Sequence, residues 1–408
     1  MVSVPPSEPC TPPAASPGLR ALMPALATKT YFNYGGQGPL PTPSLAAITA
    51  SWGRLQELGP FTAEVWPYVG QLTAGLRARL AGWVGGPPTR LALSENVTSG
   101  CVLPLWGLPW RAGDQLLIGD GEHPGVVAAC RELARRQGLG LASLPVAHLR
   151  GDPATAAVDV LEGLERALTP RTRLVVLSHL LWTTGQLMPI AAVAERLAVH
   201  PAHPWLLVDA AQSLGSLPVA AAAASADIYA GTGHKWCCGP EGLGAVALSE
   251  RLLAEARPTL IGWRSLGEEG RAESAFHADA RRFEVATSCV PLLAGLNCSL
   301  QLLEAEGSAE ERSERIRCRS HQLWHGLRTI AGVRTLLEVP PPAGLVSFTI
   351  ADQAPPPLVA RLGEQGIWLR SLDDPACLRA CTHLTTTAAE VEQLLAAVRR
   401  LAAQAAGG

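Results

Sequence analysis

Between about residues 89 and 248, short continuous apolar runs alternate with segments of helical periodicity. The apolar runs lie at 90–93, 115–118, 140–144, 173–177, 205–208, 227–230 and 243–248, and the helical segments at 126–137, 156–168 and 190–199. Strands that are apolar throughout and separated by helices predict an α/β fold with a mainly parallel sheet covered on both faces. In such a sheet the functional residues lie on loops at the carboxyl ends of the strands.

The pattern changes after residue 248 and predicts a smaller α+β domain. Two long helices are expected at 292–305 and 310–330, strands at 345–350 and 367–370, and an amphipathic helix at 388–403. Residues 261–283 are expected to be the crossing segment. We therefore expect a disordered leader (1–20), an N-terminal arm near the active site (21–40), a large domain (41–270) and a small C-terminal domain (271–408).

The composition excludes several classes of partner. The formal net charge is −2 and no apolar run is long enough to span a membrane, so we expect no nucleic-acid or membrane partner. The ten cysteines form no CxxC pair and no cluster with histidine. We therefore expect no metal site and a cytoplasmic protein with reduced thiols.

Lysine is nearly absent from the chain. Only two of its 33 basic side chains (Lys plus Arg) are lysines, Lys29 and Lys235. A lysine amine forms a Schiff base, whereas a guanidinium stays protonated. Lys235 follows the strand expected at 227–230 and lies 26 residues after Asp209, which ends the strand expected at 205–208. This spacing is the one that a pyridoxal phosphate enzyme needs; the alternative is a surface lysine.

Further candidates follow neighbouring strands. Residues 94–100 pass from a strand into a helix, and a phosphate there would rest on Thr98, Ser99 and Gly100, although an ordinary helix N-cap has the same pattern. Pro124 disfavours helix at the preceding His123, which places that imidazole in a turn where it can stack on a flat cofactor. Further contacts to this cofactor are expected from Asp209 at its ring nitrogen and from Gln212, Thr232 and His234.

These residues form an ordered set that resembles a known family. The segments 96–98, 122–124, 178–179, 209–212 and 233–236 look like the class V aminotransferase family, the cysteine-desulfurase-like branch of fold-type I pyridoxal phosphate enzymes. More narrowly, 31–40, 178–182, 262–265 and 282–287 resemble the L-cysteine/cystine C–S lyases. The resemblance runs from about residue 22 to the C-terminus.

The resemblance implies a fold and a set of roles. It implies a large domain with a seven-stranded sheet and a homodimer with active sites at the interface. Lys235 is then the Schiff-base lysine, with His123 on the ring, Asp209 at its nitrogen and Gln212 at its oxygen. Thr98, Ser99, Thr232 and His234 hold the phosphate, and Thr287 reaches in from the partner subunit. The substrate contacts implied are Asn33, Gly36, Trp263, Arg370 (distal end of a disulfide substrate) and Arg379 (α-carboxylate). Such lyases have Asn where this chain has Thr183.

The expected activity is β-elimination of cystine or cysteine to pyruvate, ammonia and cysteine persulfide or sulfide. Iron–sulfur cluster assembly is a candidate destination for the sulfur. The alternatives are a cysteine desulfurase that gives alanine and an enzyme-bound persulfide, a class V epimerase or aminotransferase, and a non-catalytic pyridoxal-phosphate-binding protein. A desulfurase needs a nucleophilic cysteine, and Cys377 and Cys381 are the nearest candidates.

Overall fold

The computed structural model describes residues 17–268 and 271–406, so most of the expected leader (1–20) lies outside the described residues. The described end of that segment differs from the expectation. Helix α1 (Pro17–Ala21) is folded against the rest of the chain, with Leu19 buried and Arg20 bound to Glu390 by two hydrogen bonds of 2.9 Å. The arm therefore begins earlier than residue 21, because an ion pair to the C-terminal helix fixes it.

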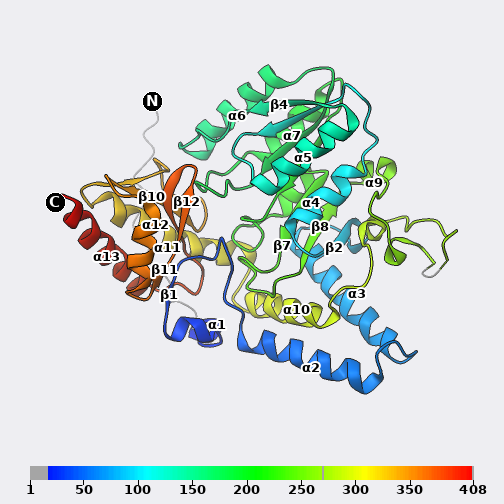
Figure 1. The fold of residues 1–408 in the computed structure, drawn as a ribbon, viewed down its shortest axis with the longest axis horizontal. Helices are drawn as coiled ribbons and strands as arrows, with labels where there is room; N and C mark the ends of the chain where they lie inside the picture. The colour runs from blue at the N-terminus through cyan, green and yellow to red at the C-terminus, as the bar shows by residue number, and fades with distance from the viewer. Residues whose placement is uncertain (1–16, 269–270, 407–408) are drawn as a thin grey trace.

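A seven-stranded sheet forms the centre of the larger part of the molecule (Figure 1). Its order is β2-β8-β7-β6-β5-β3-β4. Only β8 runs antiparallel to its neighbours, which confirms the mainly parallel sheet. The strands are β2 (Leu91–Ser94), β3 (Gln115–Gly119), β4 (Gly140–Leu144), β5 (Thr172–Ser178), β6 (Trp205–Asp209), β7 (Ile228–Thr232) and β8 (Gly244–Leu248).

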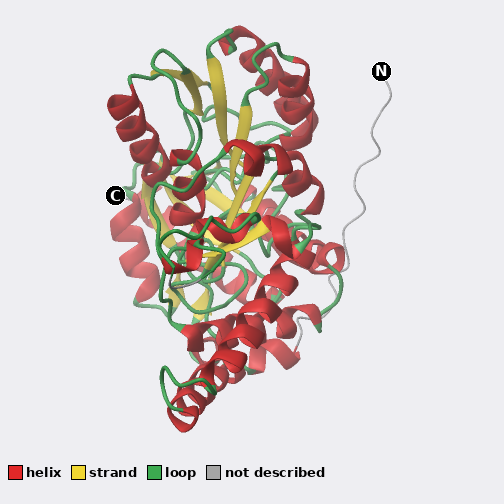
Figure 2. Ribbon diagram, turned by 90° about the vertical axis from the view of Figure 1, so that its right-hand side faces the viewer, coloured by secondary structure: helices red, strands yellow, loops and turns green. Residues whose placement is uncertain are grey.

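Helices bury both faces of this sheet (Figure 2). Along β5, Leu174 and Val176 enter the core that contains α4 and α5, whereas Val175 and Leu177 enter the core that contains α3, α6 and α7. Each such fully buried side chain contributes about 1.5–3 kcal/mol, which explains why the inner strands are apolar throughout. The edge strand at 140–144, predicted to be buried, instead buries only Leu144. The helices are α3 (Val65–Trp83), α4 (Val97–Trp106), α5 (Pro124–Gln137), α6 (Pro153–Ala167), α7 (Ile190–Val199), α8 (Ala220–Ser225) and α9 (Glu250–Glu255).

One long helix belongs to a different unit from the one that the sequence pattern predicted. Helix α10 (Val290–Glu304) packs along α2 (Thr42–Leu58) and α3, and its Leu293, Leu296 and Leu300 are part of the core of the large sheet. The expected boundary at residue 270 placed this helix in the small domain. Its apolar face instead completes the large core, so the unit around the large sheet continues to about residue 304.

The C-terminal unit is built on a four-stranded antiparallel sheet in the order β12-β13-β10-β9. Its core lies between this sheet and three helices. The arm joins this unit, since β1 (Thr30–Tyr31) pairs with β11 (Ile367–Trp368). The remaining elements are β9 (Val333–Thr335), β10 (Leu345–Ile350), β12 (Arg370–Asp373), β13 (Ala376–Cys381), α11 (Ala309–Arg328), α12 (Pro355–Gly363) and α13 (Ala388–Ala406). Within the described ranges, every helix is too short or too polar to cross a lipid bilayer.

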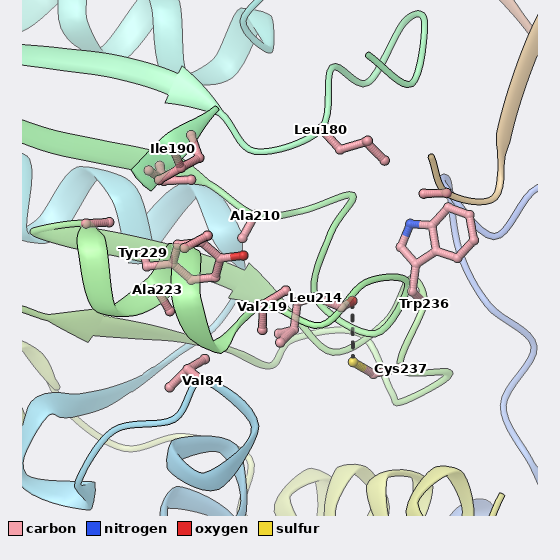
Figure 3. Close-up of a cluster of buried hydrophobic side chains, with 14 of the residues drawn as sticks. Val84, Leu180, Ile190, Ala210, Leu214, Val219, Ala223, Tyr229, Trp236 and Cys237 are labelled. Atoms are coloured by element: carbon pink, nitrogen blue, oxygen red, sulfur yellow. Dashed lines mark hydrogen bonds between the residues drawn. The ribbon is translucent and has the colours of Figure 1, made fainter. Parts of the chain in front are cut away.

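Trp236 fills the junction between the two units. The side chain is fully buried, and Figure 3 shows it near Leu214 and Cys237 of the large core. Gly344 of the C-terminal unit approaches it so closely that a Cβ on Gly344 would lie 2.6 Å from Cζ3 of the Trp236 ring and would also overlap the carbonyl of Thr382. A residue larger than glycine therefore does not fit at this junction.

We expect Gly344→Ala to destabilise the protein by about 1–3 kcal/mol, because overpacking forces backbone shifts. The matched control is Gly53→Ala: Gly53 lies in α2 with open space around its Cα, so alanine there should stabilise by about 0.5–1 kcal/mol. Urea unfolding of both variants checks this, and equal stability of the Gly344 variant and the wild type would contradict the packing.

Candidate active site

A cavity of about 270 Å³ opens where the large sheet, the C-terminal unit and the arm meet. It lies at the carboxyl ends of β5 and β6, as expected for a parallel sheet. The predicted site residues that line it are Gly36, Thr98, His123, Asp209, Gln212, His234, Lys235, Arg370 and Arg379. A larger cavity of about 860 Å³ lies between α3 and the start of α11, but none of the predicted residues lines it.

Lys235 follows β7 and is almost entirely enclosed. The pKa of its amine is lowered to about 8, chiefly by burial, with the guanidinium groups of Arg379 and Arg370 acting in the same direction and the carboxylate of Asp209 opposing them. The backbone around Lys235 is tied on both sides. The carbonyl of Lys235 accepts a hydrogen bond from Cys238 N–H at 3.0 Å, and the carbonyl of His234 accepts one from Gly38 N–H of the arm at 2.8 Å. The lowered pKa leaves about a tenth of this amine unprotonated near neutral pH, far more than for an exposed lysine.

Asp209 is the last residue of β6 and is buried. Its Oδ1 accepts a hydrogen bond from Ala211 N–H at 2.8 Å, and no ion pair to a basic side chain within the described residues satisfies its charge. Burial raises the pKa of Asp209, and the hydrogen bond from Ala211 N–H and the positive charge of Lys235 work against that rise. A buried carboxylate of this kind is costly unless a cationic ligand group pairs with it.

His123 sits at the N-cap of α5, with the extended backbone that Pro124 predicts. Its Nδ1 accepts a hydrogen bond from Gly125 N–H at 3.2 Å, so the proton of the neutral ring is on Nε2. Burial lowers the pKa of His123, with Lys235 and both cavity arginines contributing in the same direction and Asp209 opposing. The imidazole is therefore a flat, neutral ring, and it makes an edge-on contact with Trp182, 5.4 Å between centroids.

The N-terminus of α4 only partly matches the prediction. Thr98 lines the cavity, but Ser99 does not, because its hydroxyl and backbone form a capping box with Asn96. Gly100 also does not line the cavity; it packs against Ala230 of β7, where a Cβ would come within 3.2 Å. Ser99 is therefore a helix-capping residue, and of Thr98, Ser99 and Gly100 only Thr98 is open to a ligand.

Gln212 connects three parts of the chain. Its Nε2 donates to the carbonyl of Gly35 in the arm at 2.9 Å, and its Oε1 accepts from the indole N–H of Trp236 at 3.0 Å. Thr232 does not line the cavity; its hydroxyl hydrogen-bonds Nδ1 of His234 at 2.8 Å and thereby orients that ring, which does.

Two arginines of the C-terminal unit enter the cavity from adjacent strands. Arg370 and Arg379 are direct partners in the register of β12 and β13, so they share one face of that sheet. Arg379 is completely buried, and its Nη1 donates to the carbonyl of Trp182 at 2.8 Å. Its Nε and Nη2 have no hydrogen-bond partner among the described residues. Like charges held opposite each other are unfavourable unless an anion lies between them.

The structure leaves the other predicted residues outside this cavity. Thr183 is buried and its carbonyl accepts a hydrogen bond from Ser347 Oγ. Asn33, in the arm, is half-buried and its Oδ1 has no partner among the described residues. Trp263 contacts Trp66, 6.4 Å between centroids, at a different cavity, and Thr287 is exposed. Neither Trp263 nor Thr287 lies at the cavity of its own chain.

Sequence reasoning missed a buried acid behind the site. Glu122 accepts hydrogen bonds from the N–H and the hydroxyl of Ser178, both at 2.7 Å, and burial raises its pKa to about 8. Ser178 itself lines the cavity. The sequence signal for this pair was the position of Ser178 at the end of a strand. Ser178 ends β5 as Asp209 ends β6, and the two are register partners.

Comparison with known proteins identifies the family to which this chain belongs. Residues 69–396 match the family described as aminotransferase class-V. Isopenicillin N epimerase of Streptomyces clavuligerus is 30% identical over 403 residues, covering 92% of this chain and 95% of that protein. A probable cysteine desulfurase of Pseudomonas aeruginosa is 30% identical over 342 residues, covering 79% of this chain and 81% of that protein.

Two solved structures are more similar. The cystine C–S lyase C-DES in complex with its reaction product cysteine persulfide is 44% identical with a TM-score of 0.86, covering 93% of this chain and 99% of that one. A C-DES mutant with glycine covalently linked to its pyridoxal phosphate cofactor has a TM-score of 0.87 at 44% identity, covering 94% of this chain and 98% of that one. With the match over residues 69–396, the chain belongs to the class V aminotransferase family and is a pyridoxal-phosphate-dependent enzyme.

Proposed function

We propose that this enzyme is a carbon–sulfur lyase that cleaves the bond between the β-carbon and sulfur of cystine, or less readily of cysteine. The observation that carries the proposal is the cross-strand pair of Arg370 and Arg379 beside the amine of Lys235. The products from cystine are pyruvate, ammonia and cysteine persulfide, and from cysteine the sulfur product is sulfide. The 44% identity to a cystine C–S lyase supports this choice within the family.

The residues around the cavity fit pyridoxal phosphate. The enclosed amine of Lys235, with its pKa lowered to about 8, is suited to bond an aldehyde. The carboxylate of Asp209 is suited to a protonated ring nitrogen, and the neutral imidazole of His123 to stacking on the ring. Thr98, in the first turn of α4, and His234 are suited to the phosphate. When bound, pyridoxal phosphate supplies an electron sink conjugated with the substrate's α-carbon.

The two arginines suit a substrate with two carboxylates. The unpartnered Nε and Nη2 of the buried Arg379 offer two parallel N–H groups to the α-carboxylate nearest Lys235. Arg370 is exposed at the rim and is its cross-strand partner, so it suits a carboxylate farther from the reacting carbon. Cystine carries a carboxylate at each end, whereas cysteine has only one.

Lys235 then moves the proton. Once the substrate is seated on Arg379, Nζ of Lys235 accepts the proton from the α-carbon, and its lowered pKa makes it an effective base near neutral pH. The sulfur then departs from the β-carbon. Trp182 and Leu180 line the same cavity and limit the entry of water during this step.

The cysteines near the site argue against a desulfurase. Cys381 lies in β13, which is paired on one side with β10 and on the other with β12, so it cannot move as a loop residue does. Burial raises its pKa despite the adjacent Arg379, and burial raises the pKa of Cys377 to about 11. Because the thiolate is the nucleophile, neither thiol is suited to attack the substrate sulfur.

An epimerase is the second candidate, because isopenicillin N epimerase of Streptomyces clavuligerus is 30% identical over 92% of this chain. An epimerase returns the proton to the opposite face of the α-carbon and releases no sulfur. The carbon product therefore separates the candidates: pyruvate indicates a lyase, alanine a desulfurase and an inverted amino acid an epimerase.

We also propose a homodimer whose active sites receive residues from both subunits. Phe61, Trp66 and Trp263 form a row of edge-on ring contacts, and Phe61 is 84% exposed. Exposed apolar patches mark protein contacts. A second copy on this patch would explain why Trp263 and Thr287 lie away from the cavity of their own chain.

Several cysteines of the described residues, among them Cys101, Cys130 and Cys377, are free thiols, which suits a reducing compartment, and we propose the cytoplasm. The sulfur product is a suitable donor for iron–sulfur cluster assembly, which is the destination that we propose.

We expect Lys235→Ala to abolish sulfur release from cystine, because no other lysine lies at the cavity. Borohydride treatment of the wild-type holoenzyme should attach the cofactor to the tryptic peptide containing Lys235, as measured by mass spectrometry. Lys29→Ala is the control, since Lys29 is exposed and outside the cavity. Residual turnover by the Lys235 variant would rule out its role.

We expect Arg379→Lys to lower kcat/KM for both substrates by about 10- to 150-fold, equivalent to about 1.5–3 kcal/mol for a charge-assisted hydrogen bond. Arg370→Ala should affect cystine at least several-fold more than cysteine, because only cystine has a second carboxylate. Steady-state kinetics with both amino acids measure this. Equal losses for cystine and cysteine in the Arg370 variant would contradict its role at the distal end.

We expect Cys377→Ala, Cys381→Ala and the double variant to retain pyruvate release within about a factor of three. Elimination needs no protein thiol, and the change removes only one sulfur atom from each site. Product analysis by chromatography checks the carbon product. Loss of activity together with alanine formation in the wild type would assign the enzyme to the desulfurases.

A further inference from the structure

We infer that His383, which lies outside the cavity, is a positioning residue for Lys235. It acts through a directed chain of hydrogen bonds that starts at Tyr34 of the arm and ends on the carbonyl of Trp236. The inference rests on the proposed role of Lys235. His383 lies in the loop that follows β13 and is completely buried.

The hydrogen bonds determine the tautomer of His383. Its Nε2 lies 3.2 Å from the carbonyl oxygen of Trp236, and because a carbonyl only accepts, Nε2 carries the proton. Burial lowers the pKa of His383 to about 3, with the charges of Arg315 and Arg312 on α11 acting in the same direction, so the ring is neutral. Its Nδ1 is therefore an acceptor, and Thr385 Oγ1 at 3.2 Å is the donor.

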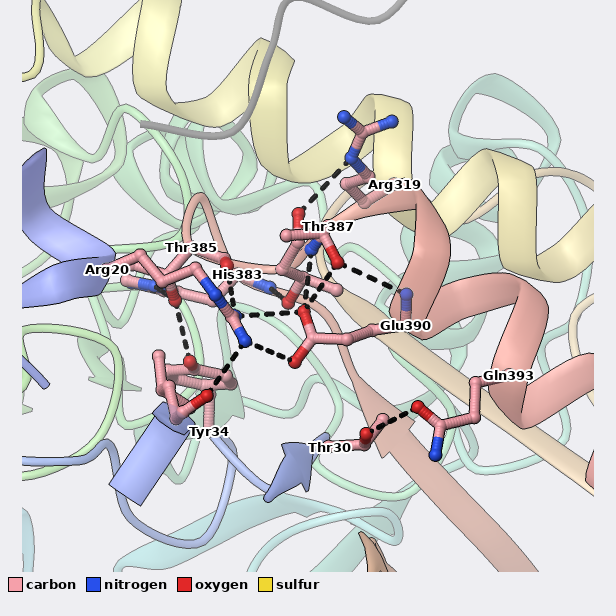
Figure 4. A network of polar contacts seen from close by, with 11 residues as sticks. Arg20, Thr30, Tyr34, Arg319, His383, Thr385, Thr387, Glu390 and Gln393 are labelled. Carbon is pink, nitrogen blue, oxygen red and sulfur yellow. Dashed lines mark hydrogen bonds and ion pairs between the residues drawn. The ribbon is translucent and has the colours of Figure 1, made fainter. Parts of the chain in front are cut away.

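The same logic extends the chain to the arm. Because the hydrogen of the Thr385 hydroxyl is used toward His383, its oxygen accepts the hydroxyl proton of Tyr34 at 2.7 Å. The Tyr34 and His383 rings also stack, with centroids 4.3 Å apart and planes 12° from parallel. Figure 4 shows Tyr34, Thr385 and His383 together in this network. The chain runs Tyr34 to Thr385 to His383 to the Trp236 carbonyl.

This chain reaches Lys235 because Trp236 is its neighbour and is held at several points. The indole N–H of Trp236 donates to Gln212, and its carbonyl accepts from His383. Trp236 as a whole has no exposed surface, so neither its indole N–H nor its carbonyl has water as a substitute partner. Losing the bond from His383 leaves a buried carbonyl unsatisfied, and the peptide one residue from Lys235 is then free to rotate.

The start of the arm is fixed by a further set of hydrogen bonds. Arg20 binds both carboxylate oxygens of Glu390 and the carbonyl of Thr385 at 2.9 Å (Figure 4). Farther along, Gly38 N–H donates to the carbonyl of His234. The arm therefore contacts the lysine loop directly at His234 and indirectly through His383, on the two sides of Lys235.

The main test compares two replacements of His383. Glutamine places a side-chain N–H near the position of Nε2 and retains the bond to the Trp236 carbonyl, whereas leucine removes it. We expect His383→Leu to lower kcat for cystine about 10- to 100-fold, because a displaced catalytic group costs this much. KM should change less than about 2-fold, since both cavity arginines are untouched. His383→Gln should recover most of the loss.

A spectroscopic readout separates positioning from a general structural role. The visible absorbance of the bound cofactor should titrate with pH at a midpoint shifted by at least about half a unit in His383→Leu and close to the wild type in His383→Gln. His148→Leu is the matched control, because His148 is exposed and its side chain makes no hydrogen bond to the described part of the chain. Equal behaviour of the Leu and Gln variants, or an unshifted midpoint in both, would overturn the inference.

A measurement on the intact wild type covers the case in which the variants do not fold. Nitrogen-15 spectra of histidine-labelled holoenzyme should include a signal from a ring that is protonated on Nε2 and does not titrate between about pH 5 and 9. Assignment of that signal to His383 supports the chain, and an Nδ1–H tautomer at His383 overturns it. Absence of any sulfur release by the wild type would reject the proposed lyase while the tautomer and the absorbance midpoints still decide the role of His383.

Discussion

The amine of Lys235 is enclosed with one carboxylate, Asp209, and two guanidinium groups, Arg370 and Arg379, as its charged neighbours. Burial and the two guanidinium groups lower its pKa to about 8, so the group is ready to bond and to exchange protons near neutral pH. The protonated amine of Lys235 and the two guanidinium groups outnumber the single carboxylate of Asp209 in a cavity of about 270 Å³. Such a site is favourable only for anionic ligands, which a phosphate and amino-acid carboxylates provide.

These charges come from parts of the chain that are far apart in sequence. The large sheet supplies Lys235 and Asp209, and the C-terminal unit supplies both arginines. Docking of the two units is fixed by hydrogen bonds to one loop, from Arg379 to the carbonyl of Trp182 and from Ser347 to that of Thr183. Separating the units would remove the arginines from the amine, which would change the pKa of Lys235 and dismantle the proposed substrate site.

The expectations that held were those with a local physical cause. Most of the apolar runs became buried strands because both faces of the sheet are covered, and Pro124 placed His123 at a helix start. The run at 140–144 is an exception, because β4 lies at the edge of the sheet and buries only Leu144. The expectations that differed depended on distant partners. Helix α10 has the periodicity of any buried helix, and only its contact with α2 and α3 assigns it to the large unit. Likewise, Arg20 is part of the fold because Glu390 lies opposite it.

The candidate site divides in the same way. The sequence by itself determined that a lysine, an aspartate and a histidine before Pro124 follow or end neighbouring strands, because residue type and position after a strand are local properties. Tertiary structure alone decided that Ser99 serves as a helix cap, that Gln212 joins Gly35 to Trp236, and that Glu122 is buried beneath Ser178. It also set Arg370 opposite Arg379. The physical reason is that burial, register and hydrogen-bond partners depend on segments brought together by packing, and no local pattern in the chain encodes those distances.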